Sequence, residues 1–140
     1  MENQVTARLI RQRRLTDERA PLAFTAIVDE AALRKPVGGP QAMRAQLCHL
    51  AELARLESVT FQVLPTALGA HQGMDGAFTI LEFVEDEDPD LLYVEYPTGA
   101  VHVEKGTEVR EARVIFDGLR SVALPPADSV AFVERLAGEL

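Results

Sequence analysis

The chain has 140 residues, 47% of them hydrophobic and 26% charged, and this balance at this length indicates one folded domain rather than a disordered chain. Asp and Glu outnumber Lys and Arg by 22 to 14, and a net charge of −8 repels a phosphate backbone, so we expect no direct nucleic-acid binding by the chain as a whole. The single cysteine excludes an intrachain disulfide. The sequence has neither a membrane-spanning apolar run nor the apolar core of a signal peptide, which predicts a cytoplasmic protein without membrane contact.

The first predicted element is an amphipathic helix within an N-terminal arm, residues 1–20. Residues 4–15 place Val5, Leu9 and Ile10 at helical spacing, with no Gly or Pro among them. The arm carries five Arg against three acidic residues, a net charge of +2, so the remaining nine basic and nineteen acidic residues sum to −10. The basic side chains either lie in water or contact an acidic partner or DNA.

A strand and two helices are predicted next. Residues 22–28, LAFTAIV, have the length and the β-rich composition of a buried strand. Asp29 can cap the short helix EAALRK that follows it. Residues 37–40, VGGP, end that helix, because Gly permits positive φ and Pro bars helix continuation. Residues 41–56 carry a wide apolar stripe, which predicts a longer helix.

Alternation and β-branched residues predict four strands in the second half of the chain, at residues 59–65, 77–83, 91–97 and 100–105. The dipeptide Thr98-Gly99 predicts a two-residue hairpin between the last two strands. The acidic loop of residues 85–90 should lie in water, where like charges can separate.

Two helices close the chain, one at residues 107–123 and one that begins at Pro126 or Asp128. This order of elements predicts the α+β class. We expect a single domain, residues 1–140, whose body at residues 21–140 holds a mostly antiparallel sheet of about four or five strands with helices on one face.

The chemistry that the residues offer is acid–base chemistry. The histidines and the cysteine lack the spacing of a zinc site, and the Gly-Gly pair lacks the spacing of a phosphate or dinucleotide loop, so we expect no metal and no cofactor. The loop of residues 69–76, GAHQGMDG, is the most site-like segment, because it holds a histidine and an aspartate between two strands. If the chain is an enzyme, His71, Asp75 and Glu95 are the candidate catalytic residues. The alternative is a flexible turn with ordinary polar residues.

Three segments carry a family resemblance: FTAIVDEAALRKPVGGPQAMRAQLCHLAEL, SVTFQVLPTALGAHQGMDGAFTILEF and LLYVEYPTGAVHVEK. In this order they resemble the C-terminal effector domain, a domain of unknown function, of actinobacterial XRE-type, antitoxin-like transcriptional regulators with a helix-turn-helix. The resemblance runs from about Arg11 to Leu140. The positions that match its motif are Asp29, Glu30, Leu33, Arg34, Gly38, Gly39, Gln46, Pro65, Gly69, His71, Gly73, Gly76 and Glu95.

The resemblance implies a role in gene regulation. In such regulators an N-terminal segment binds DNA, and this domain serves sensing, dimerisation or partner binding. A helix-turn-helix needs several short helices, whereas about one helix precedes Pro21, so the chain is expected to be either a piece of a longer protein or a natural standalone version. The implied partners are a small toxin-like protein or a small-molecule ligand, and we expect a homodimer.

Two functions follow from these observations. The first is a regulatory ligand- or partner-binding module without its own DNA-binding domain. The alternative is a small standalone enzyme of specialised metabolism that uses acid–base residues in a pocket near residues 69–76. The candidate binding residues are Asp29, Glu30, Arg34, Gln46, His71, Asp75 and Glu95. Glu30 and Arg34 stand four apart and can pair on a helix, either as a surface ion pair or as a recognition element.

Overall fold

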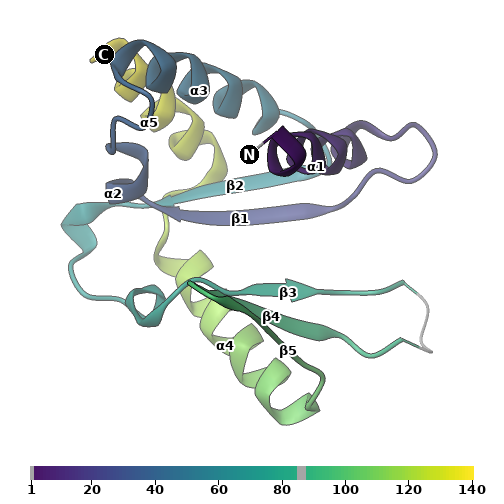
Figure 1. Ribbon diagram of the computed structural model, residues 1–140. Coiled ribbons are helices and arrows are strands. Elements are labelled where there is room, and N and C mark those ends of the chain that lie inside the picture. Colours follow the sequence, from purple (N-terminus) through teal and green to yellow (C-terminus); the bar gives the residue numbers. More distant parts are fainter. Residues whose placement is uncertain (1, 85–87) are drawn as a thin grey trace. The chain divides into compact units, whose positions relative to one another are not determined.

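The computed structural model describes residues 2–84 and 88–140 (Figure 1). The chain forms two compact units: unit 1 is Met1–Thr66 with Ala123–Leu140, and unit 2 is Ala67–Val122. The predicted α+β class is confirmed, whereas the single domain stays a prediction. Residues 85–87 of the acidic loop lie outside the described residues.

Unit 1 contains a two-stranded parallel sheet. Strand β1 (Phe24–Asp29) pairs with β2 (Val59–Leu64), in a register that runs from Phe24 opposite Val59 to Asp29 opposite Leu64. Helices α2 (Glu30–Leu33) and α3 (Pro40–Leu53) connect the strands. A crossover that contains a helix brings the chain back in the same direction, so the pair is parallel. The strands expected in one mostly antiparallel sheet therefore divide into two sheets.

The core of unit 1 lies between this sheet and two helices, α3 and α5 (Pro126–Gly138). Alternate residues of each strand point into the core, as the pleat of a strand requires. The apolar stripe predicted at residues 41–56 faces the same core. The buried members of the cluster are Leu33, Met43, Leu47, Ala51, Phe61, Val63, Phe132, Val133, Leu136 and Ala137.

Buried polar contacts join α5 to β2. Ser129 is 0% exposed, and its Oγ accepts a hydrogen bond from the Val63 amide at 3.0 Å and donates one to the Leu124 carbonyl at 3.1 Å. The Leu124 amide donates to the Val63 carbonyl at 2.9 Å, and the buried Gln62 side chain donates to the Leu124 carbonyl at 3.0 Å. Because buried polar groups are costly without partners, these bonds fix where α5 begins.

The predicted amphipathic helix of the N-terminal arm is confirmed as α1 (Glu2–Arg13), which continues into the 3-10 turn Arg14–Thr16. The Ser58 hydroxyl donates to the Leu15 carbonyl at 2.8 Å and so attaches the base of this arm to the start of β2. The apolar stripe of α1 remains more than half exposed, at Val5 (55%), Leu9 (52%) and Ile10 (56%).

Unit 2 contains a three-stranded antiparallel sheet in the order β3 (Thr79–Leu81), β4 (Leu91–Tyr96) and β5 (Gly99–Val103). Tyr96 pairs with Gly99, so the hairpin loop is Pro97-Thr98, one residue earlier than the predicted dipeptide.

Helix α4 (Gly106–Val122) covers one face of this sheet. Phe78 and Phe116 meet edge to face with ring centroids 6.4 Å apart. The Arg113 guanidinium contacts the carboxylates of Glu82 and Asp90, so Asp90 is ion-paired rather than surrounded by water as predicted for its loop. Among the residues that the structure describes, no helix combines the length and apolar character needed to cross a membrane.

Candidate functional site

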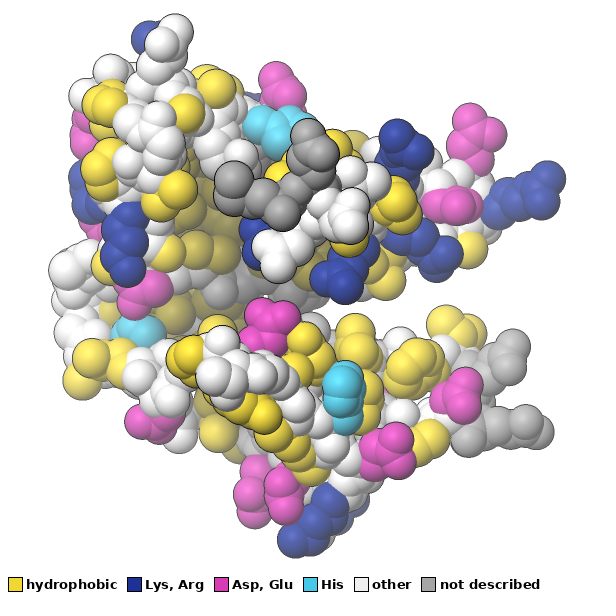
Figure 2. Space-filling model, in the orientation of Figure 1, with side chains coloured by type: hydrophobic (Ala, Val, Ile, Leu, Met, Phe, Trp, Pro, Cys, Tyr) yellow, Lys and Arg dark blue, Asp and Glu magenta, His cyan; other side chains and the backbone are white. Residues whose placement is uncertain are grey.

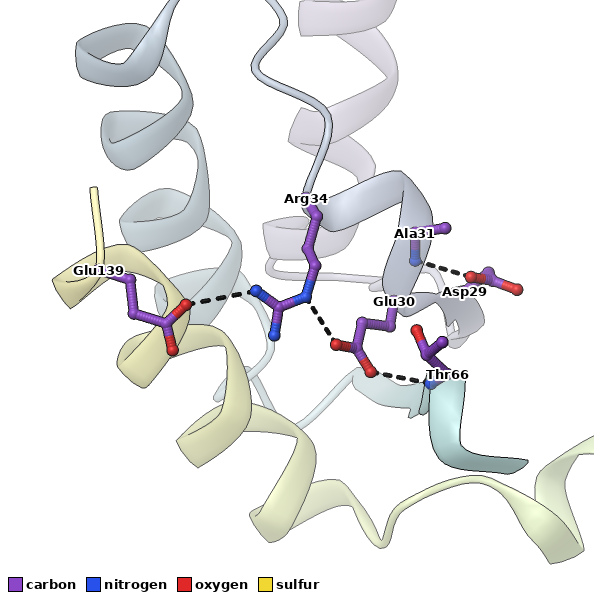
Figure 3. A network of polar contacts seen from close by, with 6 residues as sticks. All are labelled: Asp29, Glu30, Ala31, Arg34, Thr66 and Glu139. Carbon is purple, nitrogen blue, oxygen red and sulfur yellow. Dashed lines mark hydrogen bonds and ion pairs between the residues drawn. The ribbon is translucent and has the colours of Figure 1, made fainter. Parts of the chain in front are cut away.

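A polar network lies where β1 and β2 end, next to α2 (Figure 3). Three predicted binding residues, Asp29, Glu30 and Arg34, belong to it, because β1 runs directly into α2. Two further residues, Thr66 and Glu139, come from distant parts of unit 1. In open α/β sheets, ligands bind beyond the carboxyl ends of parallel strands, so this edge of the sheet is a candidate ligand site.

Asp29 acts as the predicted helix cap. Its carboxylate accepts a hydrogen bond from the Ala31 amide at 2.7 Å, which satisfies one of the free N–H groups at the start of α2. This bond gives Asp29 a structural role at the start of the helix.

Glu30 is held in its charged form. Its side chain is 12% exposed; one carboxylate oxygen accepts from the Thr66 amide at 2.8 Å and the other from Arg34 Nε at 2.6 Å. The Thr66 bond first, and then the Arg34 bond, lower the pKa of Glu30 below its ordinary value. A carboxyl group that stays ionised at neutral pH is poorly suited to general acid catalysis, so the network does not favour that role.

Arg34 joins α2 to α5. Its Nη1 donates to Glu139 at 3.3 Å, and the two carboxylates of Glu30 and Glu139 raise the pKa of the guanidinium. The guanidinium carbon also lies 5.9 Å from the centre of the Phe132 ring. An arginine between two glutamates has its charge compensated, so this network stabilises unit 1 and offers little to an anionic ligand.

Gln46, the fourth predicted binding residue in unit 1, is exposed on α3 and joins none of the hydrogen bonds described for this network. The preceding bend is built as predicted, with Gly38 at φ 79° and Gly39 at φ 90°. A side chain at Gly38 would also approach Ala42 Cβ to 3.1 Å, so the bend needs glycine.

The glycine-rich loop of unit 2 packs on α4. It contains a 3-10 turn, Gln72–Asp75, between Gly69 and Gly76, both of which have positive φ. His71 is half-buried, and a Cβ added at Gly73 would come within 3.0 Å of its Nδ1 and 3.5 Å of Leu119 on α4. Asp75 is exposed. The loop is therefore an ordered turn against the helix.

Glu95 lies on the side of the three-stranded sheet that faces away from α4, whereas the glycine-rich loop packs against α4. Thr79 pairs with Tyr93, so these two side chains lie on the same face of the sheet, and Glu95, two residues further along β4, shares that face. Phe78 precedes Thr79 and contacts Phe116 of α4, so Phe78 lies on the opposite face. Because side chains alternate along a strand, Tyr93 and Glu95 point away from α4. The predicted trio of His71, Asp75 and Glu95 is therefore not assembled into one site.

We name the side of this sheet that faces away from α4 the outer sheet face. On it, Tyr93 Oη donates to Glu95 Oε1 at 2.8 Å, and the rings of Tyr93 and His102 lie 5.0 Å apart. Leu81 on the neighbouring strand is 41% exposed. The strands contribute Thr79, Leu81, Leu91, Tyr93, Glu95, Ala100 and His102 to the outer sheet face. Glu104, which follows β5, lies at its end, where it lines one hollow with Leu91.

A shallow hollow of about 220 Å³ lies at one end of this face. Apolar and acidic side chains line it together: Phe83, Asp88, Pro89, Leu91 and Glu104. Of the candidate residues, only Glu95 belongs to the outer sheet face. The alternation in LLYVEY already places Leu91, Tyr93 and Glu95 on one face, and this signal identifies the neighbours of Glu95 from sequence.

Within the described ranges, no group of three or more His, Cys, Asp or Glu side chains is arranged to hold a metal ion. The single cysteine, Cys48, is exposed on α3. The geometry thus offers two features of different kinds: a network in unit 1 whose arginine is paired with glutamates, and an open apolar-acidic face in unit 2.

Comparison with known proteins places the chain in a family. No curated protein and no solved structure matches it significantly. A family model described as a domain of unknown function, DUF5753, matches residues 1–135. This match covers nearly the whole of both units, and the chain therefore belongs to the DUF5753 family.

Proposed function

We propose that this chain is a regulatory, partner-binding module of an antitoxin-like transcriptional regulator of the XRE type, and that it recognises a protein partner rather than DNA. It would act in the cytoplasm. The observation that supports this function is the outer sheet face, where the exposed Leu81 and the half-buried Leu91 and Tyr93 lie beside the exposed carboxylate of Glu95. Exposed apolar surface rimmed by polar groups is typical of protein interaction sites.

The charge of the chain favours the same face. Residues 67–122 hold twelve acidic and four basic side chains, which sum to −8, the whole net charge; the other residues hold ten of each. In Figure 2, acidic side chains are spread over the part built from β3, β4, β5 and α4, whereas basic ones gather around α1 and the segment that follows it. A field of this sign attracts basic segments and repels phosphates.

The partner that fits is a protein with a basic amphipathic segment. Its apolar side chains would cover Leu81 and Tyr93, and its cations would meet Glu95 and Glu104. A small toxin-like protein encoded beside the regulator is the expected source of such a segment. Binding would regulate only if it favoured one conformation of the regulator over another.

The test uses the purified chain and the small protein encoded beside its gene, with binding measured by calorimetry. Reversing two charges of the outer sheet face, Glu95→Lys with Glu104→Lys, should weaken binding by about tenfold or more. The matched control reverses two exposed charges of α4, Glu111→Lys with Asp117→Lys. It should change affinity by no more than about threefold, because it alters net charge equally but leaves the face intact.

Equal weakening by both variants would show that bulk charge alone attracts the partner and would contradict a specific face. Binding of a small molecule in the hollow with no protein binding would also contradict this function.

A further inference from the structure

We propose that the outer sheet face of one molecule receives α1 of a second copy, so that two chains form a reciprocal dimer. This rests on the proposed function, because it uses the same face: α1 of a second copy occupies the outer sheet face in the absence of the toxin-like protein, which would bind there by displacing α1. Two surfaces of the chain support this dimer: one is basic and apolar, and the other is acidic and apolar.

Helix α1 supplies the first surface. Val5, Leu9 and Ile10 form an apolar stripe that is more than half exposed, so most of its apolar area faces water in a single copy. Arg8 and Arg13 lie on the same helix and are exposed as well. An exposed stripe of this kind is stabilised when another apolar surface covers it.

The outer sheet face supplies the complementary surface. Leu81 and the half-buried Leu91 and Tyr93 offer apolar contact. Glu95 and Glu104, both exposed, offer carboxylates to the arginines. The arm at residues 1–20 carries a net charge of +2, whereas unit 2 carries −8, so the two surfaces attract each other.

The dimensions of the two surfaces agree. Helix α1 has 12 residues, which corresponds to a length of about 18 Å at ~1.5 Å per residue. Strand β4 has 6 residues and spans about 20 Å at ~3.3 Å per residue. One helix therefore covers the length of the face.

A second copy is the occupant that satisfies both surfaces at once. Each molecule carries one helix and one face, so two molecules related by a twofold axis bury both helices and both faces. Pairing of α1 with a second α1 would instead bring like charges together. The bond from Ser58 to Leu15 lies at the base of the arm, beyond the end of α1, and Val5, Leu9 and Ile10 remain more than half exposed.

Analytical ultracentrifugation of the whole chain tests this arrangement. The wild-type chain should sediment as a dimer, and Leu9→Asp should raise the dimer dissociation constant by about 30-fold or more, because it places a charge in the apolar stripe. Gln4→Asp is the matched control: it adds the same charge five residues earlier, on the opposite side of the helix, and should leave the dimer within about threefold of wild type. Circular dichroism confirms that each variant is folded.

A charge exchange makes the test specific. Arg8→Glu with Arg13→Glu, and separately Glu95→Arg with Glu104→Arg, should each be monomeric alone because like charges then face each other. When mixed, the two variants should form a heterodimer, since each helix again meets a face of opposite charge. Monomers in the mixture would overturn the proposal.

Two further outcomes separate this proposal from the proposed function. A wild-type monomer with α1 amides protected from hydrogen exchange would place α1 on its own chain and overturn the second copy as occupant. A dimer with the expected mutant pattern, but with no binding of the neighbouring small protein, would support the reciprocal dimer and contradict the toxin-like partner.

Discussion

The two units of the chain differ in what their residues do. In unit 1, a core cluster of ten buried apolar side chains lies between the two strands and the helices that cover them, and the charges of the unit balance. Unit 2 places one helix on a three-stranded sheet, buries Val109, Ala112 and Leu119 of that helix, and carries the whole net charge of −8. We therefore expect stability to reside mainly in unit 1, whereas unit 2 carries the excess negative charge.

The largest test compares one buried leucine from each unit. Leu47→Ala should lower the free energy of unfolding of unit 1 by about 3–5 kcal/mol, because Leu47 is 1% exposed among many core neighbours. Leu119→Ala should lower the free energy of unfolding of unit 2 by about 2 kcal/mol. Fewer buried apolar side chains surround Leu119 than Leu47, so the cavity can collapse more easily. Hydrogen exchange with mass spectrometry reads each unit separately. A larger loss in unit 2 would reverse the proposed division.

A second test removes the buried hydroxyl of Ser129. Ser129→Ala leaves the Val63 amide without its acceptor, so unit 1 should lose about 1–3 kcal/mol in urea unfolding. Ser121→Ala is the control, because that hydroxyl is exposed and bonds only within its own helix. A Ser129 variant as stable as wild type would mean that the bond to Val63 adds nothing.

A third test concerns Glu30 and pH. The pKa of Glu30 is lowered from its ordinary value of 4.5, so its contribution is fully present above about pH 4.5 and is lost as pH falls through the folded-state value. Glu30→Gln should cost about 1 kcal/mol at pH 7 and progressively less below pH 4.5. Thermal unfolding across pH measures the difference, with Glu57→Gln as an exposed control. A difference that grows in acid would contradict this sign.

The smallest effect is expected in unit 2. Arg113→Ala removes contacts to Glu82 and Asp90, but the Arg113 side chain is 35% exposed, so unit 2 should lose only about 0.2–1 kcal/mol. The loss should shrink in high salt, which screens exposed pairs. Urea unfolding at low and high salt shows this, and a salt-independent loss would indicate a packing role instead.

Local features of the fold could be predicted from the sequence. Helices α3, α4 and α5 have apolar residues at intervals of three and four, and these repeats reveal a helix in any context. The Asp29 cap and the Glu30–Arg34 pair were also predictable, because their partners lie within a few residues along the chain. Each of these features depends on neighbours close in sequence.

Features that join distant residues could not be predicted. The division into two sheets is one of them, because five strand-like runs alone do not distinguish one sheet from two. The helical crossover between β1 and β2 is typical of a parallel pair, but it does not show that the later strands form a separate sheet. Thr66 and Glu139 complete the Glu30 network from positions far along the chain. The separation of His71 from Glu95 follows from the position of α4, which lies on only one side of the sheet.

The insertion of unit 2 between the two halves of unit 1 has a consequence for biosynthesis. Helix α5 supplies Phe132, Val133, Leu136 and Ala137 to the core of unit 1 and follows unit 2 along the chain, so it leaves the ribosome after unit 2. Unit 2 is complete before it, so the nascent chain can fold its middle first, while its beginning waits for its end. A premature stop after residue 122 would therefore release a chain that held all of unit 2 but lacked the α5 side chains that complete the core of unit 1.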